Sequence, residues 1–210
     1  MTRGKFITFE GPDGSGKTTV SSAVCERLTE LGYSVRYSRE PGGSNIAERI
    51  RDIILDPDHT DMDPRCEALL YAASRRQHLT DIILPSLEQG THVICDRFVD
   101  SSVAYQGFGR HIGAEPIREI NAFATDGILP DKTIFLDVPA EIGLERINAG
   151  RREKDRLDQE GIAFHQAVYD GYRHVVETGG DRIVVIDASK PVDEVIENAL
   201  SAVREILDGE

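Results

Sequence analysis

Hydrophobic residues along the chain fall into short runs rich in Val, Ile, Phe and Tyr, separated by longer amphipathic stretches. The runs predict five strands, at Lys5–Phe9, Ser34–Tyr37, His92–Cys95, Thr133–Asp137 and Arg182–Ile186. The third to fifth runs are almost continuously apolar, which is typical of parallel strands buried on both faces of a sheet.

Between these runs, apolar residues recur every three or four positions, which predicts helices. The first stripe is Val20, Val24, Leu28 and Leu31, followed by Gly32 as a helix stop, and the second is Ile46, Ile50, Ile53 and Ile54. Asp63 before Pro64 predicts the start of a third helix, because Asp caps a helix and Pro suits its first position. A last helix is predicted from about Val192, with Val195, Ile196, Ala199, Leu200, Val203 and Leu207 on its apolar face.

Strands that alternate with helices predict an α/β fold, here a doubly wound, five-stranded parallel sheet surrounded by helices. The length of 210 residues fits one domain that spans residues 1–210. Ligands of such sheets bind at the carboxyl ends of the strands, so the residues that follow each strand are the candidate site.

Composition narrows the choice of partners. Lys and Arg number 24 against 37 Asp and Glu, and the net charge of −13 argues against nucleic acid or an anionic membrane as the partner. Cys25, Cys66 and Cys95 are widely spaced, which favours buried free thiols over a disulfide framework or a zinc site. With no signal-peptide pattern and no long apolar run, a cytoplasmic location is expected.

The first predicted strand is followed by a phosphate-binding motif, G-x-x-x-x-G-K-[ST]. The candidate ATP-binding residues are Gly11, Pro12, Asp13, Gly14, Ser15, Gly16, Lys17, Thr18 and Thr19. The glycines let backbone N–H groups turn toward an anion, and the helix that follows adds its N-terminal dipole. Lys17 is expected to reach the β- and γ-phosphates, and the Thr18 hydroxyl to hold Mg²⁺.

The phosphate loop alone does not define the reaction, since GTPase switches, motor ATPases and small-molecule kinases share it. The chain contains no N-K-x-D stretch for guanine recognition. Arg39 and Arg97 follow the second and third strands, and Arg75 lies in the helical region between them. Because arginine binds phosphate through two parallel hydrogen bonds, a second anion pocket is expected, as in a phosphotransferase with two nucleotide sites.

At this point the chain resembles the bacterial thymidylate kinases along almost its entire length. The matching segments are Glu10–Thr19, Arg39–Gly43, the Ala-Ser-Arg-Arg stretch that ends at Arg76, Asp96–Gly107, and the arginine-rich segment before Leu157 and Asp158. The resemblance implies transfer of phosphate from ATP to dTMP with Mg²⁺, which gives dTDP and ADP, and implies a homodimer.

The resemblance also implies roles for the acceptor-site residues. Arg39 and Arg97 would bind the acceptor phosphate with help from Arg51. Asp13 would hold the deoxyribose 3′-hydroxyl, and Tyr105 would pack under the sugar and exclude a 2′-hydroxyl.

For the base, the resemblance implies that Arg75 hydrogen-bonds the thymine carbonyl, with Ser102 and Gln106 near the polar edge. Tyr71 stands where related enzymes commonly carry a stacking Phe. Taken one at a time, each of these residues could instead be a surface ion pair, a solvated helix face or part of the core.

A basic run predicts a mobile lid over the triphosphate at about residues 146–158. It contains Arg146, Arg151, Arg152, Lys154 and Arg156, with Gly150 as a hinge. The alternative is a solvated helix end whose charges pair with Glu153 and Asp155. The phosphate loop has Gly14 and Ser15 where the eukaryotic enzymes carry an arginine, which agrees with arginines supplied by a lid.

The resulting mechanism is alignment and charge neutralisation, because the acceptor phosphate is already anionic. The candidate catalytic residues are Lys17, Arg97, Arg151, Arg152 and Arg156, and the candidate metal-site residues are Thr18 and Asp96, the latter through water. The alternatives are another nucleoside or deoxynucleoside monophosphate kinase and a regulatory ATP-binding switch.

Overall fold

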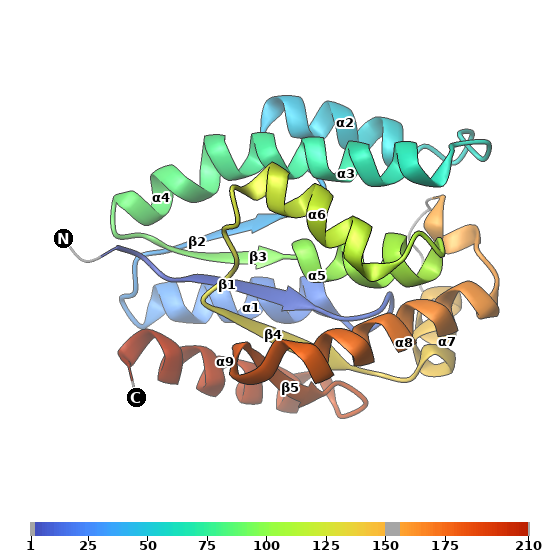
Figure 1. Ribbon diagram of the computed structural model, residues 1–210. Coiled ribbons are helices and arrows are strands. Elements are labelled where there is room, and N and C mark those ends of the chain that lie inside the picture. The colour runs from blue at the N-terminus through green and yellow to red at the C-terminus, as the bar shows by residue number, and fades with distance from the viewer. Residues whose placement is uncertain (1–2, 150–155, 210) are drawn as a thin grey trace.

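The sheet of the computed structural model, which describes residues 3–149 and 156–209, is entirely parallel (Figure 1). Its strands are β1 (Phe6–Glu10), β2 (Val35–Arg39), β3 (His92–Asp96), β4 (Lys132–Asp137) and β5 (Ile183–Asp187). All five predicted strands are confirmed, with ends displaced by at most two residues. The predicted doubly wound α/β architecture is therefore observed.

The spatial order of the strands is β2-β3-β1-β4-β5. This order places β1 in the centre, where all five of its residues are buried, and makes β5 an edge strand with Val185 50% exposed. The expected burial on both faces is therefore right for β3 and β4 but wrong for β5. An apolar run in the sequence does not reveal which strand lies at the edge.

Helices cover both faces of the sheet. They include α1 (Lys17–Glu30), α2 (Asn45–Leu55), α3 (Pro64–His78), α4 (Leu84–Glu88), α5 (Val99–Ser102), α6 (Ala114–Thr125), α7 (Ala140–Ala149), α8 (Ile162–Gly179) and α9 (Val192–Asp208). Two π-helical segments, η1 (Leu79–Ile83) and η2 (Val103–Gly109), continue α3 and α5, and the short 3₁₀ turns are η3 (Leu157–Gln159) and η4 (Gly180–Arg182). In Figure 1, α1 and α9 lie together on one side of the sheet and α3 and α6 on the other.

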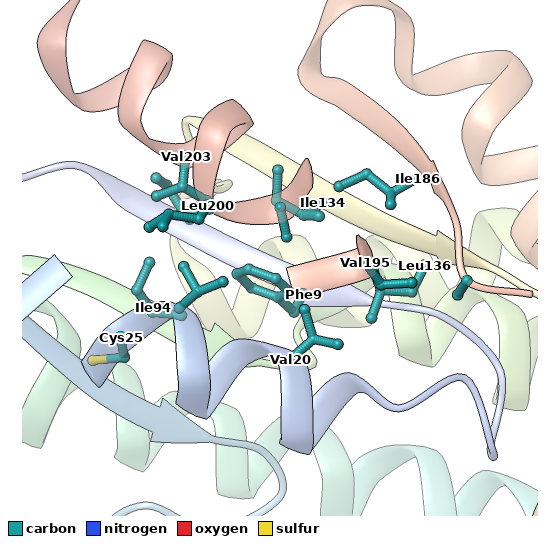
Figure 2. Packing of buried hydrophobic residues seen from close by; sticks show 14 of the residues in the cluster. Phe9, Val20, Cys25, Ile94, Ile134, Leu136, Ile186, Val195, Leu200 and Val203 are labelled. Carbon is teal, nitrogen blue, oxygen red and sulfur yellow. The ribbon is translucent and has the colours of Figure 1, made fainter. Parts of the chain in front are cut away.

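The core between the sheet, α1 and α9 forms because alternate residues of a strand point to opposite faces. Ile7 and Phe9 of β1 face this core, while Phe6 faces the helices of the other side. Figure 2 shows the strand residues Phe9, Ile94, Ile134, Leu136 and Ile186 against Val20 of α1 and Val195, Leu200 and Val203 of α9. The apolar stripe predicted for the last helix is thus the face that α9 buries.

The stripes predicted for the first two helices are buried only in part. Helix α1 ends at Glu30, Leu31 beyond it is 54% exposed, and Gly32 follows with φ of +92°. Helix α2 packs on α3 and not on the sheet, so Ile46 and Ile53 remain about half exposed. The start of α3 is as predicted, because the Asp63 carboxylate accepts hydrogen bonds from the backbone N–H groups of its first turn.

The cysteine prediction is correct for two of the three thiols. Cys25 and Cys95 are buried and free, whereas Cys66 is exposed and the expectation of burial is wrong for it. Cys66 lies in the first turn of α3, on the side of the helix that faces solvent. Within residues 3–149 and 156–209, no helix is long and apolar enough to cross a membrane.

Two leucines at the end of α1 test this description of the core. Leu28 is completely buried, so Leu28→Ala is expected to lower the free energy of unfolding by about 2–5 kcal/mol, through lost apolar contact and a residual cavity. Leu31→Ala, at the exposed neighbour, is the matched control and should change it by less than about 0.5 kcal/mol. Urea denaturation of the three proteins measures both values, and equal losses would contradict the assignment.

Candidate active site

The loop between β1 and α1 has the backbone of an anion-binding site. Gly16 has φ of +86° and provides no side-chain cap for α1, so the first N–H groups of the helix are not taken by a cap. At Gly14, a Cβ atom would lie 2.2 Å from the carbonyl oxygen of Gly143 in α7, and only glycine permits this approach. The loop is therefore held between the sheet and α7 by backbone contact.

Lys17 lies within the loop and is 6% exposed. Its Nζ donates to the carbonyl oxygen of Pro12 at 2.8 Å and lies 3.4 Å from Ser15 Oγ. Burial and the positive charge of Arg97 lower the pKa of Lys17 to about 8. A phosphate at this position would supply the negative charge that the buried ammonium lacks.

Thr18 and Asp96 form a polar pair at the mouth of the loop. The Thr18 hydroxyl donates to Asp96 Oδ2 at 2.5 Å. The second oxygen, Asp96 Oδ1, is buried and has no hydrogen-bond partner among the described residues. One hydroxyl and one unsatisfied carboxylate oxygen are hard oxygen donors that fit Mg²⁺ bound by few protein ligands and several waters.

Arg97 follows β3 and joins the phosphate loop to the rest of the site. Its guanidinium forms an ion pair with Asp13 and packs over the Tyr105 ring at 4.9 Å. Burial would raise the pKa of Asp13, but the charges of Arg97 and Lys17 lower it to about 2. Arg97 has φ of +73°, an uncommon backbone conformation for a residue with a side chain, and it occurs where the chain turns out of the sheet.

Glu10, the last residue of β1, is hydrogen-bonded to the segment that follows Arg97. Its buried carboxylate accepts hydrogen bonds from the Phe98 backbone at 2.7 Å, the Ser101 hydroxyl at 2.5 Å and the Tyr172 hydroxyl at 3.1 Å. Burial and the negative charge of Asp100 raise the pKa of Glu10 from 4.5 to about 7. The sequence analysis assigned Glu10 no role, since an acidic residue at the end of a strand has no distinguishing signal.

Arg39 and Arg51 lie together beside the cavity, because both donate to the carbonyl oxygen of Pro41 at 2.9 Å. Glu48 on α2 accepts from Arg39 at 3.0 Å and from the Gly43 backbone N–H at 2.7 Å. Two cations from β2 and α2 are thus fixed beside the same loop.

Arg75 on α3 is only 2% exposed and is almost fully bonded. Its Nε donates to Glu40 at 2.7 Å and its Nη2 to the carbonyl oxygen of Phe98 at 2.9 Å, while Nη1 donates to Ser102 and Asn121. One of its five N–H groups has no partner among the described residues. The sequence analysis did not find Glu40 or Asn121, which fix this side chain.

A cavity of about 530 Å³ unites these groups. Its walls include every predicted acceptor-site residue: Asp13, Arg39, Arg51, Tyr71, Arg75, Arg97, Ser102, Tyr105 and Gln106. They also include Asp96 and five further residues of the phosphate loop and the start of α1, Gly14, Gly16, Lys17, Thr18 and Thr19. The structure therefore places the two predicted anion sites in one continuous space.

The predicted lid is described only in part. Arg151 and Arg152 lie outside the described residues, as do Gly150 and Lys154. Arg146 on α7 lines the cavity and donates to the carbonyl oxygens of Gly14 at 3.3 Å and Ala188 at 3.0 Å.

Arg156 is 6% exposed and donates to Glu67 at 2.6 Å and to the carbonyl oxygen of Ile54 at 2.9 Å. In this arrangement its guanidinium is bound to α2 and α3 and not to the phosphate loop.

A parallel sheet, a phosphate loop and a second arginine-lined pocket in one cavity define a nucleotide-dependent phosphotransferase. A model of the thymidylate kinase family matches residues 9–199. The chain belongs to the thymidylate kinase family.

Individual relatives agree with this assignment. Thymidylate kinases of Geobacillus sp. strain WCH70 and Halalkalibacterium halodurans are each 54% identical over 208 residues, which cover 99% of both chains. The crystal structure of the thymidylate kinase of Ehrlichia chaffeensis superposes with a TM-score of 0.77 at 33% identity and covers 96% of this chain and 99% of that one.

The buried Glu10 carboxylate predicts a pH-dependent stability. Because folding raises its pKa to about 7, the stabilisation from its protonated form is complete below about pH 4.5 and is lost as the pH rises through 7. Glu10→Gln removes this ionisation. The free energy of unfolding of Glu10→Gln minus that of the parent should therefore be larger at about pH 8 than at about pH 5. Denaturant titration of both proteins at both pH values measures this difference.

Glu26→Gln, on an exposed part of α1, is the matched control and should show no such trend. If the difference in free energy of unfolding between Glu10→Gln and the parent stays constant across this pH range, Glu10 does not titrate there.

Proposed function

We propose that this protein transfers the γ-phosphoryl group of ATP to dTMP and releases ADP and dTDP. The observation that carries the proposal is the one cavity that links the phosphate loop around Lys17 to Arg39, Arg97 and the wall around Arg75. An oxygen of the acceptor phosphate forms the new bond to the γ-phosphorus, while the bond from this phosphorus to the bridging oxygen of ADP breaks.

On the donor side, the free N–H groups at the start of α1 and the Lys17 ammonium bind the phosphates of ATP. Thr18, together with Asp96 through water, would hold Mg²⁺, which would supply neutralisation of the phosphate charge. Arg146, which already contacts the loop, adds a further positive charge at its edge.

On the acceptor side, Arg97 binds the phosphate of dTMP together with Arg39 and Arg51. Asp13, kept ionised by its low pKa, is an acceptor for the sugar 3′-hydroxyl and also orients Arg97. Because the loop that binds ATP also contains Asp13, the two substrates are aligned by one segment of the chain.

At the far end of the cavity, Tyr71 provides a stacking face and Arg75, Ser102 and Gln106 provide the polar edge. Arg75, Ser102 and Gln106 are buried and hydrogen-bonded to other side chains, while Tyr71 is half-buried at the wall, which suits recognition of one flat base. Arg151 and Arg152 are proposed lid residues that neutralise charge during transfer, whereas the bonds of Arg156 to Glu67 and to the Ile54 carbonyl oxygen favour a structural role for it.

We also propose that the protein acts as a cytoplasmic homodimer. Helix α2 packs on α3, and α3 packs on α6. Large apolar residues are exposed on each of them, Ile46 and Ile53 on α2, Leu69 on α3 and Phe123 on α6. An apolar surface of this kind supports association with a second copy.

A panel of acceptors tests the proposed activity. With ATP and Mg²⁺, kcat/KM for dTMP should exceed that for AMP and GMP by about 10²-fold or more, since Arg75 and Gln106 at the cavity wall offer a donor and an acceptor that match thymine. A coupled assay of ADP release on dTMP, dUMP, dCMP, AMP and GMP gives the values. Release of ADP that no monophosphate accelerates would instead indicate an ATP-hydrolysing switch.

Tyr105 tests recognition of the sugar. Its ring is 3% exposed and is fixed under Arg97 and against Tyr172, so it cannot move aside for a 2′-hydroxyl. Tyr105→Ala should reduce the preference for dTMP over ribothymidine monophosphate by about tenfold or more.

Tyr105→Phe keeps the ring and is the matched control, which should retain most of the preference. The ratio of the two kcat/KM values measures the effect, and a ratio unchanged in Tyr105→Ala would exclude this role.

A further inference from the structure

Glu67, in the first turn of α3, is fully buried although it is no part of the predicted site. Its carboxylate accepts hydrogen bonds from three side chains. Gln106 Nε2 donates to Oε1 at 2.7 Å, Arg156 Nη2 donates to Oε2 at 2.6 Å, and Arg110 Nε lies 3.2–3.3 Å from both oxygens. Gln106 is also a wall residue of the active cavity, so Glu67 connects two arginines to the base pocket.

This contact determines which way the Gln106 amide faces. A carboxylate between two guanidinium groups is ionised and can only accept hydrogen bonds, so Gln106 must present an N–H to it. The amide oxygen of Gln106 is then the end that is not bound to Glu67. No described residue donates a hydrogen bond to this oxygen.

The neighbouring Arg75 has the opposite character, because a guanidinium can only donate. Glu40 and Ser102 hold it, and it lines the same cavity as Gln106. The wall therefore offers a fixed donor and a fixed acceptor. Thymine presents the complementary pair, the O4 acceptor and the N3–H donor, whereas cytosine presents a donor amino group and an unprotonated N3 acceptor.

We propose that Glu67 is a specificity-determining positioning residue, which selects thymine over cytosine by holding the Gln106 amide in one orientation. The inference rests on the proposed dTMP kinase activity. Glu67 does not touch the base and acts through Gln106.

The two arginines explain why the orientation is fixed. Arg156 donates to Glu67 and to the Ile54 carbonyl oxygen, and Arg110 Nε lies within hydrogen-bond distance of both Glu67 oxygens, so two positive charges lie beside Glu67. A neutral amide in place of Glu67 could donate as well as accept, and Gln106 would then be free to turn over. A turned amide presents N–H to the cavity, which disfavours N3–H of thymine and suits N3 of cytosine.

The experiment is the ratio of kcat/KM for dTMP to that for dCMP, measured on the same preparation of each variant. The fraction of folded protein cancels in this ratio, so a purely structural loss leaves it unchanged. Glu67→Gln should lower the ratio by about tenfold or more. Gln106→Met, which leaves Glu67 and its arginines in place, should also lower it, and it tests the proposal if Glu67→Gln does not fold.

Two further variants separate orientation from general disturbance. In the exchanged double variant, Glu67→Gln with Gln106→Glu, the total charge is unchanged and the group facing the base can again only accept, so the ratio should recover toward the parent value. Glu160→Gln removes the other carboxylate partner of Arg110 without touching Gln106, and should leave the ratio unaltered.

An unchanged ratio in Glu67→Gln or in Gln106→Met overturns the proposal, and so does an exchanged variant that stays as unselective as Glu67→Gln. A parent protein that does not phosphorylate dTMP contradicts the proposed function instead. A parent that prefers dTMP while its variants keep that preference contradicts only the role of Glu67.

Discussion

The ion pair between Asp13 and Arg97 is the interaction on which the active cavity depends. Strands β1 and β3 are neighbours, with Phe9 beside Asp96 in register, so the two residues arrive at the same place from segments more than 80 positions apart. Neither charge could be buried alone without a large desolvation cost. Together they fix the phosphate loop against the end of β3 before any nucleotide is bound.

The same arrangement recurs around the cavity and explains how an acidic protein makes a site for two anions. Arg39 is held by Glu48, Arg75 by Glu40 and Arg97 by Asp13. A guanidinium that already makes several bonds has lost its conformational freedom, and its remaining N–H groups keep fixed directions. The carboxylates therefore preorganise the arginines, and the cost of ordering them is met in folding and not in substrate binding.

The sequence predicted much of this, because strand and helix periodicity and the phosphate-loop motif are local patterns. All five strands were predicted in this way, and the residues that the family resemblance assigned to the acceptor site all line the cavity. The carboxylates that hold the site were not found. Glu10, Glu40 and Glu67 look in the sequence like ordinary solvated acids, and their burial results only from packing between distant segments.

The wrong predictions of burial have the same origin. Val185, Leu31 and Cys66 carry side chains typical of the interior, yet Val185 and Leu31 are about half exposed and Cys66 is exposed. Periodicity shows that a segment has an apolar face, but not which element will lie against that face. Edge position in the sheet and the packing of α2 on α3 are properties of the whole fold.

The contact between Gly14 and Gly143 has a mechanical consequence. The backbones of the phosphate loop and α7 meet with no side chain between them that could change rotamer and absorb a displacement. Arg146, one turn further along α7, bonds the Gly14 carbonyl oxygen and lines the cavity. The loop and α7 are therefore coupled through backbone contact, and a displacement of the loop at Gly14 would have to shift α7 and Arg146 with it.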